Sequence, residues 1–403
     1  MVKHMSENDD ARLGTLCVWG GETEKNFWLG AVEVPVVNSV TFGYKDVDKW
    51  LAVAKGLQAG HIYSRNTNPT VAVFEEKMRR LEKAEAATSF STGMAAISNT
   101  FFALLSAGDR VVSITDTYGG VSKIFLEFFP RFGIKVTLCK TEDYDAIERE
   151  VEKGCKLLYL ESPTNPTLKI VDIRRLANFA HKFGSIVAVD NTFATPINQR
   201  PIELGADLVI HSATKFLSGH SDAMGGVVCG KKELVDKIFH FREINGASLN
   251  PVAAYMLIRG IKTLHLRVSR QNDNAMQIAK FLESHPMVEK VFYPGLPSHK
   301  YHEVARRQMS GFGGILSFQL KGGFEAVRLF LPRLRYAHLA ANLGSVETIT
   351  GPPATTSHVE CSPEEREALG IPESLIRYSV GIEDVKDLIA DLEQALDYLK
   401  TAI

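Results

Sequence analysis

Apolar runs and stretches of helical periodicity alternate along the middle of the chain, between about residues 61 and 258. Three short runs are rich in apolar residues and predict strands, and the last of them is continuously apolar from residue 186 to 189, which is typical of a strand buried on both faces of a parallel sheet. They occupy residues 110–114, 156–160 and 185–190. Apolar side chains recur at helical spacing in residues 71–81 and 173–183. This alternation predicts βα units and a mostly parallel sheet.

The last third of the chain predicts a second, smaller folding unit. Residues 253–281 place Leu, Ile and Met at helical spacings and are expected to link the two parts. Beyond them, residues 313–320 predict a strand and residues 384–399 a closing amphipathic helix. The first 60 residues contain several aromatics and few periodic stretches, as expected of an arm that packs against another surface. We therefore expect an arm at 1–60, a large α/β domain at 61–260 and a small α+β domain at 261–403.

Composition narrows the possible partners. With 403 residues, 45% of them hydrophobic and 23% charged, the chain resembles ordinary globular proteins. Its net charge of −1 provides no broad basic field, so nucleic acid is not an expected partner. No apolar run approaches the roughly 20 residues that span a bilayer, and the N-terminus lacks the apolar core of a secretory signal. We expect a cytoplasmic protein with no membrane partner.

The five cysteines are scattered and form no C-x-x-C pair: Cys17, Cys139, Cys155, Cys229 and Cys361. This pattern favours reduced thiols over disulfides, a metal site or a catalytic cysteine, and no metal is expected. The His4-Met5 pair is consistent with a cloning junction, with Met5 as the natural start.

Lys215 is the strongest candidate for chemistry. It lies in the hydroxyl-rich segment Ser212-Ala213-Thr214-Lys215, downstream of Asp190, the carboxylate that ends the apolar run at 185–190. An amine that attacks an aldehyde must be near-neutral, and such a lysine together with a carboxylate for the pyridinium nitrogen suits pyridoxal 5′-phosphate (PLP). The alternative role for Asp190 is structural: a carboxylate at the end of a strand can also cap the turn that follows. We predict PLP as the cofactor.

Hydroxyls and a glycine provide candidates for binding the cofactor's phosphate. The segment Ser91-Thr92-Gly93-Met94 precedes good helix formers, so backbone N–H groups at a helix start would face the anion. The same pattern is also that of an ordinary helix N-cap. Ser212 and Thr214 could add hydroxyl donors beside the lysine, and Arg65 a charge-assisted bond.

Loops after two of the predicted strands add candidates for the cofactor ring. Tyr118 follows the run at 110–114, where a flat ring can stack on the pyridine, although loop tyrosines also pack for structural reasons. Asn165 lies between two prolines that stiffen its loop, and it can bond the phenolic oxygen. His211 and His220 are interpreted as structural, because the lysine itself can transfer protons.

These motifs resemble the cysteine/methionine-metabolism family of PLP enzymes, which includes cystathionine γ-synthase, cystathionine lyases, methionine γ-lyase and O-acylhomoserine sulfhydrylases. The matching segments follow the family's order over nearly the whole chain: 63–69, 91–94, 118–120, 161–166, 190–192, 212–226 and 377–383. The resemblance implies fold-type I, the aspartate-aminotransferase-like α/β fold. It also implies a homo-oligomer, expected to be a tetramer built from dimers with shared active sites.

The resemblance assigns roles to single residues. Lys215 would bond the cofactor and act as the base, and Tyr118 would stack on the ring and protonate the leaving group. The implied cofactor contacts further include Tyr63, Arg65, Gly93, Met94, Asn165, Asp190, Thr192, Ser212 and Thr214. Of these, Tyr63 and Arg65 would reach the phosphate from a neighbouring subunit. Arg377 would grip the substrate's α-carboxylate, a bidentate role that suits arginine, and Asn342 is a second substrate-binding candidate.

Three departures from the family patterns bear on the reaction. Gly120 stands where methionine γ-lyases usually have cysteine. Residues 342–344 resemble the sulfhydrylases, whereas residues 346–348 are closer to the synthases and lyases. Residues 121–123 depart from the Thr-Asn-Arg of cystathionine lyases. We expect γ-replacement on an O-activated homoserine by a thiol, with a γ-lyase that releases a 2-oxo acid and ammonia as the alternative. An aminotransferase and a non-catalytic PLP carrier rank below both.

Overall fold

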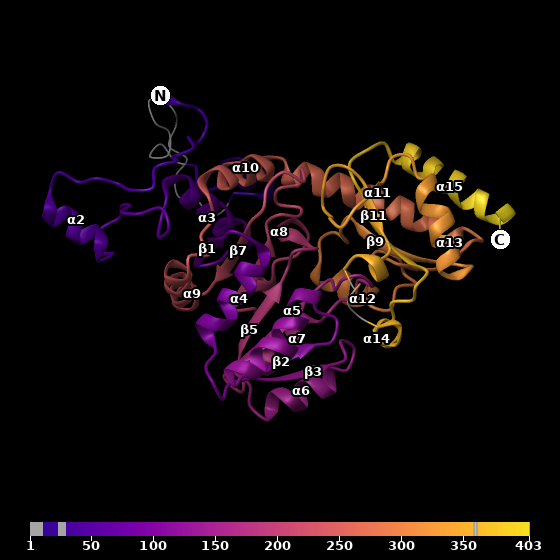
Figure 1. Ribbon diagram of the computed structural model, residues 1–403, viewed down its shortest axis with the longest axis horizontal. Coiled ribbons are helices and arrows are strands. Elements are labelled where there is room, and N and C mark those ends of the chain that lie inside the picture. Colours follow the sequence, from indigo (N-terminus) through magenta and orange to yellow (C-terminus); the bar gives the residue numbers. More distant parts are fainter. Residues whose placement is uncertain (1–10, 23–29, 358, 360–361, 403) are drawn as a thin grey trace.

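A seven-stranded sheet forms the centre of the larger part of the molecule (Figure 1). The computed structural model describes residues 11–22, 30–357, 359 and 362–402. The strands are β1 (Ala86–Phe90), β2 (Arg110–Ile114), β3 (Lys135–Cys139), β4 (Leu157–Glu161), β5 (Ile186–Asp190), β6 (Leu208–Ser212) and β7 (Gly226–Gly230). Their order is β1-β7-β6-β5-β4-β2-β3, and only β7 runs antiparallel to its neighbours. The prediction of a mostly parallel sheet is confirmed.

Helices cover both faces of this sheet: α3 (Pro69–Glu82), α4 (Gly93–Leu104), α5 (Gly119–Lys123), α6 (Tyr144–Glu152), α7 (Ile173–His181), α8 (Thr195–Asn198), α9 (Lys232–Asn245) and α10 (Pro251–Lys262). Alternate strand residues point to opposite faces. Leu157 and Tyr159 pack in one cluster with α4 and α9, while Leu158 and Leu160 pack in another with α6 and α7. Burial on both faces explains why β4 and β5 are continuously apolar up to their last residue.

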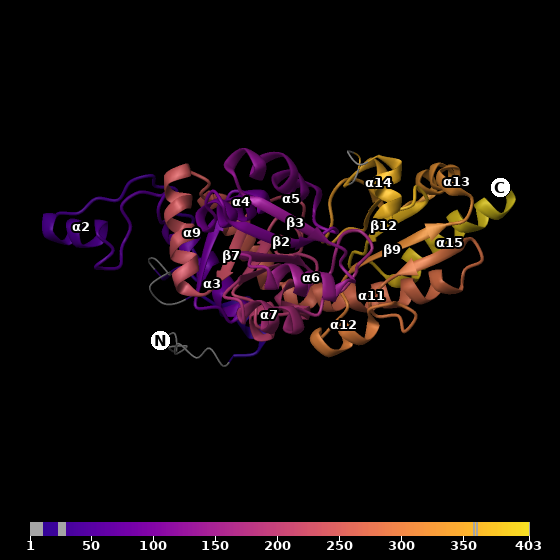
Figure 2. The same cartoon turned by 90° about the horizontal axis from the view of Figure 1, so that it is seen from below.

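The predicted helical stretch at 253–281 is two helices, because α10 ends at Lys262 and α11 (Leu264–Ser284) begins after Thr263. The Thr263 hydroxyl donates to the Gly260 carbonyl and accepts from the Arg267 side chain. Such local side-chain bonds compete with the regular helical pattern. The first turns of α11 pack in the cluster of α3 and α10, and its later turns pack in the C-terminal cluster. Thus α11 connects the two parts of the molecule (Figure 2).

The C-terminal part is built on a five-stranded sheet of order β10-β11-β12-β9-β8. Its strands are β8 (Val288–Phe292), β9 (Ile315–Leu320), β10 (His338–Leu339), β11 (Ile349–Gly351) and β12 (Leu375–Ser379), and only the β10–β11 pair is parallel. The helices are α12 (His302–Gln308), α13 (Gly323–Phe330), α14 (Pro363–Ala368) and α15 (Val385–Ala402). The predicted strand and closing helix are confirmed as β9 and α15, and the α+β class with them.

The N-terminal segment contains α1 (Leu13–Trp19), which packs on the large part, and α2 (Val47–Ala54), which stands away from the body (Figures 1 and 2). Large apolar side chains on and around α2 are exposed, among them Trp50 at 48% and Leu57 at 79%. The predicted packing of this arm on a second subunit stays a prediction.

Four cysteines, Cys17, Cys139, Cys155 and Cys229, are buried free thiols. Cys361 and the proposed start at Met5 lie outside the described residues. Among the helices of the described chain, none is both long and apolar enough to cross a membrane.

Candidate active site

A cavity of about 380 Å³ opens where the carboxyl ends of β4, β5 and β6 face the second sheet. Ligands of open α/β sheets bind at this edge. Most of the predicted site residues line the cavity together: Gly93, Met94, Tyr118, Asn165, Asp190, Thr192, Ser212, Thr214, Lys215, Asn342 and Arg377. The first and the last of these residues, Gly93 on α4 and Arg377 on β12, lie in different parts of the molecule and far apart in the sequence. The fold alone brings these residues together.

Tyr63 and Arg65 do not line this cavity within one chain. The Arg65 guanidinium lies 5.0 Å from the centre of the Tyr63 ring, and its Nε donates to the Glu243 carbonyl at 3.0 Å. The family resemblance implies that both residues belong to the active site of a neighbouring subunit, and this role stays a prediction.

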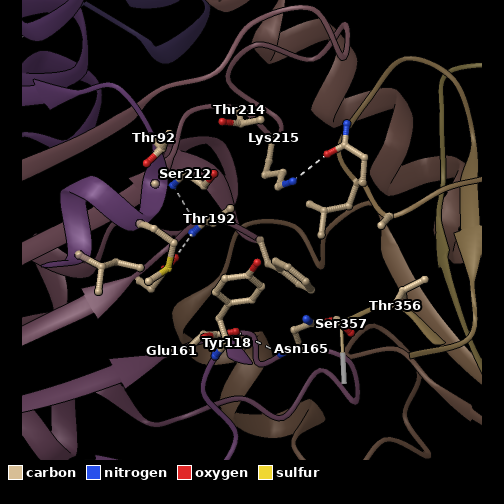
Figure 3. Close-up of a pocket in the computed structure, with 18 of the residues that line it drawn as sticks. Thr92, Tyr118, Glu161, Asn165, Thr192, Ser212, Thr214, Lys215, Thr356 and Ser357 are labelled. Atoms are coloured by element: carbon tan, nitrogen blue, oxygen red, sulfur yellow. Dashed lines mark hydrogen bonds between the residues drawn. The ribbon is translucent and has the colours of Figure 1, made fainter. Parts of the chain in front are cut away.

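Lys215 directs its amine into the cavity (Figure 3). Its Nζ donates to Asn342 Oδ1 at 2.8 Å. Burial lowers the pKa of the Lys215 amine to about 8, and the positive charge of Arg377 adds to this effect. A larger fraction of the amine is therefore neutral near physiological pH than for an exposed lysine. Attack on an aldehyde requires this neutral form.

Arg377 lies on β12 and is fixed at both ends of its guanidinium. Nη1 donates to Asn165 Oδ1 at 3.1 Å, and Nη2 donates to the Asn342 carbonyl at 3.2 Å. Burial lowers the pKa of Arg377 to about 10, so the group remains charged at neutral pH. A buried, oriented guanidinium is suited to bind a carboxylate in a bidentate manner.

The N-terminus of α4 meets the segment before Lys215 at the end of the cavity that would hold a phosphate. Thr92 caps the helix by accepting from the Ala95 N–H at 3.0 Å. A Cβ at Gly93 would lie 2.7 Å from the Ser212 Cβ, so only glycine permits this approach. The Ser212 N–H in turn donates to Thr192 Oγ1 at 2.9 Å. Helix N–H groups beside hydroxyls fit an anion.

Asp190 and Glu161 form a pair of buried carboxyl groups at the ends of adjacent parallel strands. Asp190 accepts from the Thr192 N–H at 2.9 Å. Burial raises the pKa of Asp190, while hydrogen bonds from Thr192 and the nearby His211 oppose this effect. Burial and the neighbouring Asp190 raise the pKa of Glu161 well above its ordinary value. A cationic ring nitrogen placed here would relieve the cost of these charges.

Sequence reasoning did not identify Glu161 as a site residue, although it lines the cavity. Its position carried the necessary signal: it ends one buried strand just as Asp190 ends the next. Since neighbouring parallel strands end at the same sheet edge, two such carboxyl groups can be expected to meet.

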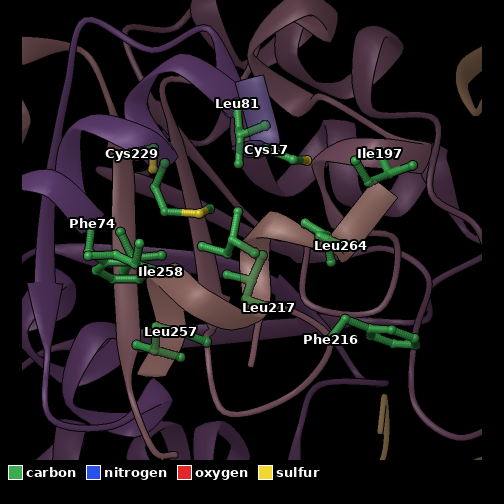
Figure 4. Close-up of a cluster of buried hydrophobic side chains, with 14 of the residues drawn as sticks. Cys17, Phe74, Leu81, Ile197, Phe216, Leu217, Cys229, Leu257, Ile258 and Leu264 are labelled. Carbon is green, nitrogen blue, oxygen red and sulfur yellow. The ribbon is translucent and has the colours of Figure 1, made fainter. Parts of the chain in front are cut away.

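The loop after Lys215 is held from below by the hydrophobic core and by a buried arginine. Phe216 and Leu217 insert into the cluster formed with α3 and α10 (Figure 4). Arg267 donates to the Phe216 carbonyl at 2.9 Å and to the Leu217 carbonyl at 3.4 Å. Glycine suits position 219, because its φ of +72° lies in the left-handed region and a Cβ there would lie 2.1 Å from the Arg267 Nη1. Arg267 is a second residue that the sequence reasoning missed.

Comparison with known proteins gives a consistent result. A protein-family model described as "Cys/Met metabolism PLP-dependent enzyme" matches residues 14–397. The chain is 44% identical to an L-methionine gamma-lyase of Fusobacterium nucleatum subsp. polymorphum, covering 96% of this chain and 98% of that protein. It is 44% identical to an O-succinylhomoserine sulfhydrylase of Pseudomonas aeruginosa, with 84% of each chain covered.

A solved structure is similar over almost the full length. It is a cystathionine gamma synthase from Xanthomonas oryzae pv. oryzae in complex with aminoacrylate and cysteine. The TM-score is 0.92 at 35% identity, and the match covers 98% of this chain and 100% of that one.

Proposed function

Because this chain belongs to the Cys/Met metabolism family of PLP-dependent enzymes, whose cofactor is PLP, we propose that it catalyses γ-replacement on an O-activated homoserine with a thiol nucleophile. The observation that carries the proposal is the placement of a lysine amine with a lowered pKa and a buried arginine in one cavity. Together they suit a substrate that carries an amino group and a carboxylate on the same carbon.

The residues of the cavity fit the cofactor. Lys215 would bond its aldehyde and Asp190 would pair with its ring nitrogen. Gly93, Met94, Thr192, Ser212 and Thr214 would surround its phosphate, and Tyr63 and Arg65 of a second subunit would complete that site. Tyr118 would stack on the ring, and Asn165 would bond the phenolic oxygen. When bound, PLP withdraws electrons from the substrate carbon that loses its proton.

The chain's own groups supply the proton transfers and the substrate contacts. The Lys215 amine accepts a proton in its neutral form, which burial favours. Arg377 orients the substrate by its α-carboxylate, with Asn342 beside it. The Tyr118 hydroxyl is proposed to give a proton to the leaving group at the γ-carbon.

Gly120 favours replacement over methionine cleavage. Methionine γ-lyases usually have cysteine at this position. A Cβ at Gly120 would lie 2.8 Å from the Met94 Sδ and 3.1 Å from the Tyr118 Cε1. A cysteine at this position would therefore require the Met94 and Tyr118 side chains to shift from the arrangement seen here.

The similarity to an L-methionine gamma-lyase at 44% identity favours a second candidate function, a γ-lyase that releases a 2-oxo acid and ammonia. Both reactions use the same groups up to departure of the γ-substituent. The difference is whether a thiol adds afterwards.

We also propose a homo-oligomer, a tetramer built from dimers, in which the arm carrying α2 packs on a neighbouring subunit. The exposed apolar side chains of that arm support this assembly. A cytoplasmic location is proposed because the described cysteines are free thiols, the state that a reducing compartment maintains.

Product analysis by mass spectrometry tests the reaction. The PLP-loaded protein is incubated with O-acetyl- and O-succinyl-homoserine in the presence of cysteine and sulfide, and Lys215→Ala serves as the inactive control. Cystathionine or homocysteine would support replacement and identify the thiol. Formation of 2-oxobutanoate alone would indicate the lyase, and unchanged esters would contradict the choice of substrate.

A further inference from the structure

Glu161 is a buried carboxyl group whose two oxygens are bound to two different loops. It ends β4 and is only 5% exposed. Oε2 accepts from the Tyr118 N–H at 2.9 Å, and Oε1 accepts from the Asn165 N–H at 3.2 Å. One side chain thus links the loop after β2 to the loop after β4.

These two loops present the side chains proposed to contact the cofactor ring. The Tyr118 side chain is 44% exposed, so packing alone does not fix its ring. The Tyr118 carbonyl accepts from the first turn of α5, at 2.8 and 3.1 Å, which holds one side of its backbone. Tyr118 is the N-cap residue of α5, and its side chain makes no capping hydrogen bond. The bond from its N–H to Glu161 holds the other side, and with it the direction in which the ring points (Figure 3).

Asn165 is constrained on both sides. Its backbone N–H donates to Glu161, and its side-chain oxygen accepts from Arg377. Glu161 is thus connected through Asn165 to the arginine proposed to bind the substrate. A shift of the Glu161 carboxyl group would therefore move Tyr118 and Asn165, and through Asn165 the Arg377 guanidinium.

We propose that Glu161 is a positioning residue, which holds the Tyr118 ring and the Asn165 amide in the arrangement that binds PLP. This role is exerted through the positions of these two residues and is separate from the effect of its charge on the neighbouring Asp190. The inference rests on the cofactor contacts of the proposed function and does not depend on the choice between replacement and elimination.

The test compares Glu161→Gln with a matched variant outside the cavity. In Glu161→Gln the amide keeps one acceptor oxygen, but its NH₂ group faces a backbone N–H, so one of the two loop bonds is lost. Asp391 is the control: it is 3% exposed and accepts from the backbone N–H groups of Arg335 at 2.9 Å and Tyr336 at 3.1 Å. Asp391→Asn makes the equivalent change on α15.

Three quantities are measured on each protein: the Kd for PLP by fluorescence titration, the visible circular dichroism of bound PLP, and the Tm of the cofactor-free form. Both variants are expected to lower Tm, because each loses a buried hydrogen bond. Only Glu161→Gln is expected to raise the Kd for PLP, by about tenfold or more, and to weaken the dichroism band. Asp391→Asn should keep both cofactor values of the wild type.

Equal cofactor binding by the wild type and Glu161→Gln would overturn the inference and leave the proposed function intact. Failure of the wild type to bind PLP would contradict the proposed function itself. If Glu161→Gln does not fold, Glu161→Asp replaces it, because the shorter side chain withdraws the carboxyl group from both loops by one methylene. The Kd for PLP and the dichroism band of that variant are then compared with those of the wild type and of Asp391→Asn.

Discussion

Replacing Lys215 with methionine should stabilise the cofactor-free protein at neutral pH. The side chain keeps its approximate length but loses a charge that the folded state disfavours. Burial, with Arg377 nearby, lowers the pKa of Lys215 from an ordinary 10.5 to about 8. That lowering corresponds to roughly 3 kcal/mol of the free energy of unfolding. The loss of a donor to Asn342 Oδ1 offsets about 1–3 kcal/mol of the gain.

The pH dependence separates these two contributions. Below about pH 8 the lysine is charged in both states, and the full cost applies to the folded protein. As the pH rises from about 8 to 10.5, the folded lysine loses its proton while the unfolded one keeps it, so the cost falls to zero. The hydrogen-bond contribution does not change in this way. Between pH 7 and 9.5 the advantage of Lys215→Met should therefore shrink by about 2 kcal/mol.

Urea unfolding at the two pH values measures this difference. The wild type, Lys215→Met and a control, Lys237→Met, are compared without cofactor. Lys237 is an exposed lysine on α9, so its replacement should give the same difference at both pH values. An equal advantage of Lys215→Met at pH 7 and 9.5 would refute the reasoning, because burial of the amine would then not disfavour its charge.

Three further variants test other parts of the structure. Arg377→Lys should raise KM for the amino-acid substrate about a hundredfold in steady-state assays, because an ammonium cannot bind a carboxylate in the planar bidentate way. Glu82→Leu should lower the free energy of unfolding by about 3–5 kcal/mol in urea, since it leaves the buried His211 without the carboxylate 2.6 Å away. Gly93→Ala should weaken PLP binding at least about tenfold by fluorescence titration, because its Cβ would lie 2.7 Å from that of Ser212.

The sequence predicted most strongly where a local pattern alone determines structure. The strands that end at Asp190 and Glu161 are apolar because both faces are buried, and this signal needs no knowledge of the rest of the chain. The break at Thr263 was missed, since the helical periodicity continues across it. Only the bonds of its hydroxyl to Gly260 and Arg267 show why one helix ends there.

Residues that act through distant partners could not be predicted in the same way. Arg267 had no motif around it, and its role follows only from α11 passing beneath the loop after Lys215. Glu161 was included in a recognised segment, yet its two backbone partners lie 43 and 4 positions away, on different loops. The spacing of residues along the chain does not reveal that the two Glu161 oxygens accept hydrogen bonds from the Tyr118 and Asn165 loops. The three-dimensional arrangement was needed.

The cavity brings together four ionisable side chains whose charged forms lower the stability of the folded protein. Burial shifts the pKa of Lys215 and Arg377 downward and that of Asp190 and Glu161 upward, so each group is pushed toward its neutral form. Apolar residues at these positions would give a more stable protein. A ligand with a cationic ring nitrogen and an anionic phosphate can pair with both signs, and its binding would return part of this free energy. The hydrophobic cluster beneath the lysine loop offsets this cost, because it stabilises the fold and fixes the backbone of the loop although the charges in the cavity are unfavourable.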